Sequence, residues 1–228
     1  MNKQDQIKNW IGDLEKCHAC ALRDEENRGP TRYSGTIASP IMFVGEGPGG
    51  VEDIYGVPLV GPSGRLLDKA LWSVGLTRDR IYVTNIVKCR PKTNRTPTIS
   101  EGAFCAERYL RREISVVEPK VIVALGKVAF RYFYKEDGSI VHFRGQWLEW
   151  NGIPVMPTFH PAFLLRKTGR DLVDAKWHVY YDLKAAVDKA VSIVPDYTYK
   201  SDAMPNLLIT YDYLKQKRQI TEMRTTNK

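Results

Sequence analysis

The segment IMFVGEGPGG, Ile41–Gly50, joins a short apolar run to a glycine-rich turn. The run is rich in β-branched residues and lacks polar alternation, which is typical of a strand buried on both faces of a parallel sheet. Three more runs of this kind follow, at Ile81–Thr84, Val121–Leu125 and Ile153–Met156, with helical patterns between or after them. This alternation predicts an α/β fold, a three-layer α/β/α sandwich with a central four-stranded, mostly parallel sheet.

Five segments carry apolar residues at helical spacing. They span residues 1–20, Ser63–Val74, Ser100–Val116, Gly126–Tyr134 and Asp171–Ile193. Ser63 and Ser100 stand at the start of their segments, where a serine side chain can bind the free amides of the first turn, so we expect each to be an N-cap. Residues 21–38 are rich in arginine, glycine, serine and threonine and are expected to form a loop.

Length and charge limit the classes of function. The chain has 228 residues, 43% of them hydrophobic, so it can bury a sizeable core. Lysine and arginine total 34 against 26 acidic residues, and the net charge of +8 favours a polyanionic partner such as nucleic acid. No apolar segment is long enough to span a bilayer, and the N-terminus has no signal-peptide core. We therefore expect a cytoplasmic, nucleoid-associated monomer with no membrane partner.

The sequence changes character near Pro195. We expect residues 1–194 to form the main domain and residues 195–228 to form a C-terminal appendage, with a candidate strand at Leu207–Tyr211. Such an appendage is either packed on the domain or partly disordered. It is the candidate contact surface for a replication or repair protein.

Polar residues follow each predicted strand. Glu46 follows the first strand, Asn85 the second, Lys127 the third and His160 the fourth. Because ligands of open parallel sheets bind beyond the carboxyl ends of the strands, we expect these four side chains to meet at one edge. The glycine-rich turn allows backbone amides to approach a ligand, but it has neither the lysine of a phosphate loop nor the glycine spacing of a dinucleotide-binding fold.

The four cysteines carry a more specific signal. Cys17 and Cys20 form a C-x-x-C pair, Cys89 comes soon after the second strand, and Cys105 lies in the third predicted helix. In a reducing compartment they indicate metal binding rather than disulfides. Four thiolates can hold either zinc or an iron–sulfur cluster, and the spacing does not choose between them. The alternative is four unrelated buried thiols.

Two basic segments adjoin the predicted edge of the sheet. The first, KCRPKTNR, spans Lys88–Arg95, and the second comprises Arg166, Lys167 and Arg170. Such side chains neutralise phosphates of nucleic acids. A single segment of this kind could equally be solvated loop charge, but two beside one edge favour a nucleic-acid surface.

Six segments carry a family resemblance: Cys17-x-x-Cys20, Met42–Asp68, Tyr82–Thr98, Cys105, Pro119–Ala129 and Phe159–Arg166. With these, in this order, the sequence resembles the family 4 uracil-DNA glycosylases, the iron–sulfur type. The resemblance implies a [4Fe–4S] cluster on Cys17, Cys20, Cys89 and Cys105. It also implies hydrolysis of the N-glycosidic bond of uracil in single- or double-stranded DNA, the step of base excision repair that leaves an abasic site.

The resemblance assigns roles around the base. Glu46 is expected to orient the attacking water or to stabilise the cationic sugar, while the backbone of Gly45 and Gly47 lines the pocket. The target base must leave the stack to reach this pocket. Asn85 is expected to read the edge of uracil, and His160 is expected to donate a hydrogen bond to uracil O2 as a neutral imidazole.

Two more positions belong to the expected base pocket. Glu52 takes the family's position for excluding the methyl group of thymine. Leu59 stands where the family usually has an aromatic residue that stacks on the flipped base, and stacking of this kind is worth about 1–3 kcal/mol. Tyr55 is a candidate replacement for the missing ring. We expect reduced activity or an altered base preference.

The loop Pro161–Arg166 resembles the wedge that enters the minor groove of DNA. Phe163 and Leu164 are its expected apolar side chains, and Arg166 is expected to contact phosphate. Arg90 and Arg95, from the first basic segment, are further DNA-binding candidates.

Two other functions compete with the enzyme. One is a catalytically weak or inactive DNA-binding module with the glycosylase fold, associated with replication. The other is a zinc-stabilised nucleotide-binding protein. The joint presence of Glu46, Asn85 and His160 favours the enzyme.

Overall fold

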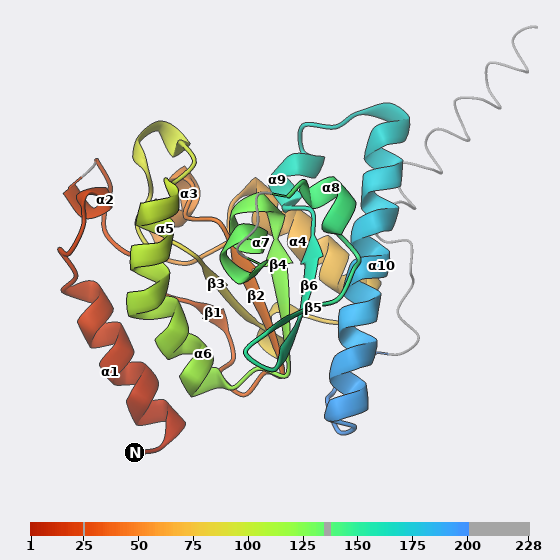
Figure 1. Ribbon diagram of the computed structural model, residues 1–228, viewed down its shortest axis with the longest axis horizontal. Coiled ribbons are helices and arrows are strands. Elements are labelled where there is room, and N and C mark those ends of the chain that lie inside the picture. The colour runs from red at the N-terminus through yellow and green to blue at the C-terminus, as the bar shows by residue number, and fades with distance from the viewer. Residues whose placement is uncertain (25, 135–137, 201–228) are drawn as a thin grey trace, which may run out of the picture.

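A computed structural model describes residues 1–24, 26–134 and 138–200 (Figure 1). Within these residues six strands form one sheet, in the order β1-β3-β2-β4-β6-β5. The four central strands are parallel and confirm the four predicted runs: β2 (Ile41–Gly45), β3 (Tyr82–Asn85), β4 (Val121–Leu125) and β6 (Ile153–Thr158).

The prediction of a four-stranded sheet was incomplete, because an antiparallel strand lies at each edge. β1 (Ser34–Gly35) pairs with β3, and β5 (Leu148–Trp150) pairs with β6. β1 has only two residues, too few for an apolar pattern. β5 and β6 are joined by Asn151 and Gly152, both with positive φ (50° and 78°). An Asn-Gly pair is a strong hairpin signal, so this strand could have been found in the sequence.

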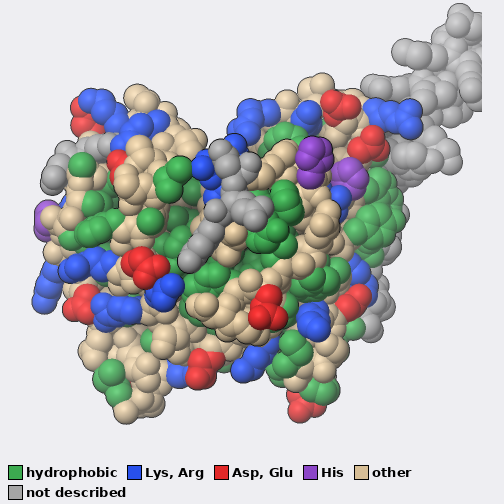
Figure 2. Space-filling view, viewed as in Figure 1, with side chains coloured by type: hydrophobic (Ala, Val, Ile, Leu, Met, Phe, Trp, Pro, Cys, Tyr) green, Lys and Arg blue, Asp and Glu red, His purple; other side chains and the backbone are tan. Residues whose placement is uncertain are grey.

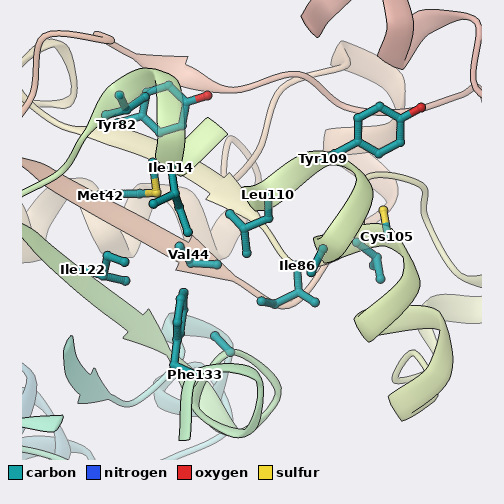
Figure 3. Packing of buried hydrophobic residues seen from close by; sticks show 14 of the residues in the cluster. Met42, Val44, Tyr82, Ile86, Cys105, Tyr109, Leu110, Ile114, Ile122 and Phe133 are labelled. Atoms are coloured by element: carbon teal, nitrogen blue, oxygen red, sulfur yellow. The ribbon is translucent and has the colours of Figure 1, made fainter. Parts of the chain in front are cut away.

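Successive strand residues face opposite sides of the sheet, and each side carries its own core. One core holds Met42, Tyr82 and Ile122 (Figure 3). It lies under α1 (Lys3–Glu15), α5 (Ile99–Cys105), α6 (Arg111–Val117) and α7 (Gly126–Tyr134). The other core holds Phe43 and Val83 and is covered by α4 (Pro62–Ser73) and α10 (Gly169–Ile193). This is the predicted three-layer sandwich.

Both predicted serine caps are displaced by their neighbours. α4 begins at Pro62 with Gly61 as its N-cap, because proline suits the first helical position, where its missing N–H is not needed. α5 begins at Ile99 with Thr98 as its N-cap. Glu101 stands three residues after Thr98 and completes a capping box, which favours this start over Ser100.

Short elements connect the layers. They are α2 (Ala21–Asp24), α3 (Gly50–Tyr55), α8 (Ile140–Phe143), α9 (Pro161–Leu164), the 3-10 turns η1 (Arg78–Arg80) and η2 (Lys92–Asn94), and the π-helical turn η3 (Ala106–Leu110) between α5 and α6. The segment predicted as one loop, residues 21–38, therefore contains α2 and β1.

The start of the C-terminal appendage lies on the main domain. Tyr197 and Tyr199 pack against the core under α10. The Tyr197 hydroxyl donates to the carbonyl oxygen of Arg80 at 2.7 Å. The candidate strand Leu207–Tyr211 lies outside the described residues. Among the residues that are described, no helix combines the length and apolar character needed to cross a membrane.

Candidate active site

The register of the sheet places Asn85 beside Gly45, at the carboxyl ends of β3 and β2. The Asn85 side chain is buried, and within the described chain neither its Oδ1 nor its Nδ2 has a hydrogen-bond partner. A Cβ added to Gly45 would lie 2.4 Å from Asn85 Oδ1 and 3.7 Å from His160 Nε2. The amide and the imidazole therefore meet over Gly45, whose missing side chain leaves them room.

His160 is held as a neutral hydrogen-bond donor. It is the N-cap of α9, and its Nδ1 accepts a hydrogen bond from the backbone N–H of Ala162 at 3.1 Å. An accepting Nδ1 places the ring proton on Nε2. Burial, aided by the charge of Arg166, lowers the pKa of His160 to about 4. Gly126 has a φ of +83° and lies against the base of the His160 side chain, since a Cβ there would come within 2.8 Å of His160 Cβ.

Glu46 and His160 line one hollow of about 460 Å³, together with Gly47, Glu52 and Leu59. Figure 2 shows the outline of the molecule hollowed between the part that carries α5 and the part that carries α9. Burial raises the pKa of the Glu46 carboxyl, while a hydrogen bond with Thr96 and the charge of Arg166 oppose that rise. The structure thus brings Glu46, Asn85 and His160 to one place.

Glu52 shapes the wall of the hollow. Its buried carboxylate accepts hydrogen bonds from three backbone amides, those of Gly49 (3.2 Å), Val60 (3.0 Å) and Gly61 (2.8 Å). Gly49 is the N-cap of α3, whereas Val60 and Gly61 belong to the turn after that helix. The carboxylate therefore joins the start of α3 to the turn that follows it. The carboxylate therefore holds the loop that presents Leu59.

Leu59 is a buried hydrophobic residue with a left-handed backbone, at φ 53°. Arg78 donates a hydrogen bond to the carbonyl oxygen of Leu59 at 2.9 Å. A Cβ added to Gly64 would lie only 1.7 Å from the same oxygen, so this close approach requires glycine. Two expectations beside it need correction. Tyr55 is 70% exposed and does not line the hollow, so it does not replace the missing ring. Lys127 is exposed and lies outside the lining as well.

The predicted wedge loop also needs a correction. Leu164 is 2% exposed and packs in the core under α10, so it is not available for insertion into DNA. Its neighbour Leu165 is 52% exposed. Phe163 is half-buried and packs against Phe159 with the two rings tilted by 30° and 4.6 Å between their centroids. Leu165 is therefore the most exposed apolar side chain of this loop.

The basic residues divide into three groups. Lys88 is 1% exposed and forms an ion pair with buried Glu113, so its place in a DNA-binding surface was predicted wrongly. Arg90 donates to Asn94 Oδ1 at 2.7 Å, beside the hollow, and Arg95 forms a two-pronged ion pair with Glu101. Arg166 is exposed and lines the hollow.

The four cysteine thiols lie near one another. Cys89 and Cys105 are buried in the core under α5, and Cys17 and Cys20 pack against it half-buried. Burial, reinforced by the charges of the other three thiols, raises the pKa of Cys89 to about 12. Within the described residues, no three potential metal ligands converge tightly enough for a single ion. The donor set is all-sulfur.

Comparison with known proteins agrees with this geometry. Residues 33–184 match the Uracil DNA glycosylase superfamily. The chain is 43% identical over 177 residues to a protein of Thermotoga maritima named type-4 uracil-DNA glycosylase. The aligned region covers 75% of this chain and 90% of that protein. Proteins of the same name from Sulfurisphaera tokodaii and Saccharolobus solfataricus are 38% and 39% identical, over 72% and 71% of this chain and 77% and 78% of theirs. The chain therefore belongs to the type-4 uracil-DNA glycosylases of the Uracil DNA glycosylase superfamily.

Proposed function

We propose that this protein excises uracil from DNA by hydrolysing the N-glycosidic bond, as a step of base excision repair. The observation that carries the proposal is the buried amide of Asn85, whose two polar atoms have no partner within the described chain and whose Oδ1 lies over Gly45, where the imidazole of His160 also approaches. A buried polar group without a partner is costly, which indicates that a ligand supplies the missing hydrogen bonds.

The amide of Asn85 selects uracil by its hydrogen-bond pattern. Its Oδ1 accepts from uracil N3–H, and its Nδ2 donates to uracil O4. Cytosine carries an amino donor at position 4 and an unprotonated N3, so both contacts would be mismatched. Rejection of this kind is strong, because mismatched polar groups are left buried and unpaired.

His160 and Glu46 act on the two sides of the breaking bond. As C1′–N1 breaks, its electron pair moves onto the base, and His160 Nε2–H donates to the O2 that becomes negative. The Glu46 carboxylate faces the cationic sugar and holds the attacking water. The water oxygen bonds to C1′, and its proton passes by way of Glu46 to solvent. The base leaves as its anion and takes a proton from solvent, so uracil and an abasic site are the products.

The cysteines are the ligands of a [4Fe–4S] cluster in this proposal. Four neighbouring thiols suit a cluster, because each thiolate can bind a different iron. When bound, the cluster supplies a cross-link rather than a reaction step. Cys17 and Cys20 would tie the end of α1 to Cys89 and Cys105 near the base pocket.

An oligonucleotide with a single uracil tests the proposed function. The purified chain should convert it to an alkali-labile abasic site, in single- or double-stranded form, and should leave the matched cytosine oligonucleotide intact. DNA binding without strand breakage after alkali would instead support the inactive, replication-associated module.

The activity should depend on pH through Glu46 and His160. Glu46 acts as a carboxylate, and its raised pKa means that it protonates, and the rate falls, at a higher pH than for an ordinary glutamate. His160 stays neutral until the pH approaches about 4. We expect a constant single-turnover rate at neutral pH and a fall on the acid side. A rate that rises as the pH falls below 6.5, the ordinary pKa of histidine, would indicate a cationic donor and contradict this account.

Leu59→Phe should improve uracil excision. The ring would restore stacking on the base, worth about 1–3 kcal/mol, so kcat/KM should rise about tenfold or more. The left-handed backbone at Leu59 is no more strained for phenylalanine than for leucine. Leu59→Met is the control, because it keeps an apolar contact without a ring and is not β-branched, so the left-handed backbone tolerates it as it tolerates leucine. No gain in the phenylalanine variant would count against the stacking argument.

Two neighbouring leucines should give opposite phenotypes. Leu165→Ala should leave thermal stability unchanged, because the side chain is 52% exposed, and lower excision from double-stranded DNA more than from single-stranded DNA. Leu164→Ala should cost about 2–5 kcal/mol of folding free energy, since it leaves a cavity in the core. Thermal melting and excision assays on both DNA forms measure the difference. Equal losses on both forms for Leu165→Ala would argue against a wedge.

A further inference from the structure

A buried ion pair lies directly behind the base pocket. Lys88 and Glu113 are 1% and 0% exposed, and the Lys88 ammonium contacts a Glu113 carboxylate oxygen. The Tyr82 hydroxyl donates to the other carboxylate oxygen at 2.8 Å. A buried pair of this kind seldom adds net stability over apolar residues of the same volume, so its presence needs another explanation.

Lys88 turns back onto the strand that carries Asn85. Its Nζ donates to the hydroxyl of Thr84 and, at 3.0 Å, to the backbone carbonyl oxygen of Asn85. Trp10 of α1 covers the ammonium, with 5.5 Å from Nζ to the ring centroid. The three donors of the ammonium are thus used on Glu113, Thr84 and Asn85, and the end of β3 is held from behind.

The same pair reaches the cysteine-bearing segments. Lys88 directly precedes Cys89. Glu113 lies on α6, which continues through η3 from α5, the helix that carries Cys105. A side-chain connection therefore runs from the helices around the cysteines to the backbone of the base-reading residue.

We propose that Lys88 is a positioning residue for uracil recognition, which fixes the backbone of Asn85 and is itself fixed by Glu113. The inference rests on the proposed function. Asn85 ends β3, and its amide makes no hydrogen bond of its own within the described chain, so its direction is set by its backbone and by packing. Without the contact from Lys88, the amide would no longer be held in register with the base.

A neutral double variant separates positioning from stability. Lys88→Met alone would leave the Glu113 charge buried and unpaired. The resulting loss of folding stability would hide any effect on uracil recognition. Lys88→Met with Glu113→Gln buries no charge, and the glutamine oxygen still accepts from Tyr82. We expect this variant to fold with a melting temperature close to that of the wild type and to keep its visible absorbance.

The double variant should nevertheless bind free uracil at least tenfold more weakly in calorimetry. Its excision rate should fall about 10²-fold, the effect expected of a displaced reacting group. The control is Lys184→Met with Asp188→Asn, which removes an exposed ion pair on α10 and should change neither measurement. Thr84→Val removes one acceptor of Lys88 at nearly constant volume and should weaken uracil binding severalfold, a test that does not depend on the double variant folding.

Wild-type uracil affinity in the folded double variant, or in Thr84→Val if the double variant does not fold, would overturn this inference alone. A wild-type chain that neither binds nor excises uracil would overturn the proposed function as well. The two failures are therefore distinguishable in one set of measurements.

Discussion

Replacing His160 by alanine should lower the single-turnover rate of uracil excision by about 10²–10³-fold, the usual cost of removing one donor to a developing oxyanion. The backbone N–H of Ala162 fixes the proton of His160 on Nε2, and Nε2 lies 3.7 Å from the Cβ position of Gly45, where Asn85 also points. The lost donor is therefore the one aimed at the departing base. Rapid-quench assays at saturating enzyme measure the effect.

The exposed residue His142 provides the matched control. His142→Ala should excise uracil at the wild-type rate. His142→Ala should melt at the wild-type temperature, and His160→Ala should melt within a few degrees of it, because its only structural loss is the side-chain cap of the short helix α9. A His160→Ala variant within threefold of the wild type would remove the imidazole from the mechanism.

Cys17→Ala should abolish the visible absorbance of the protein and lower its melting temperature at the same time. Cys17 is half-buried, so its own packing contributes little, and a large loss would be the effect of losing the proposed cluster. Metal sites of this kind contribute several kcal/mol to folding. Since each 1 kcal/mol shifts the melting temperature by about 2–4 °C for a chain of this size, we expect a fall of about 10 °C or more.

Lys16→Ala, at the exposed residue next to Cys17, is the control and should keep both colour and stability. Absorbance spectra and thermal melting of the two variants, purified without oxygen, settle the comparison. A colourless Cys17→Ala protein that melts like the wild type and still excises uracil would contradict a structural role for the cluster.

The central sheet could be predicted from the sequence because parallel strands buried on both faces are continuous apolar runs, such as VIVAL at Val121–Leu125. Because both faces of such a strand are buried, its residues are apolar without alternation. The edge strands could not be predicted in the same way. β1 has two small residues and owes its pairing to the neighbouring strand β3. β5 was missed for another reason, because its signal in the sequence is the Asn151-Gly152 hairpin pair before β6 and not an apolar run.

The site was predictable at the level of residues and not at the level of contacts. The rule that ligands bind beyond the carboxyl ends of strands brings Glu46, Asn85 and His160 together in the sequence and in the structure. Which of two adjacent leucines faces solvent depends on the direction of a four-residue helix, α9, and no periodicity shows that. Lys88 belongs to a basic segment by sequence, and only its packing against Glu113 reveals that it is buried.

The most direct test of the account is a crystal structure of the protein with free uracil. We expect the base to lie in the hollow beside Gly45, with Asn85 hydrogen-bonded to N3 and O4 and His160 Nε2 hydrogen-bonded to O2. A base that binds elsewhere in the hollow, with the Asn85 amide still without a partner, would contradict it.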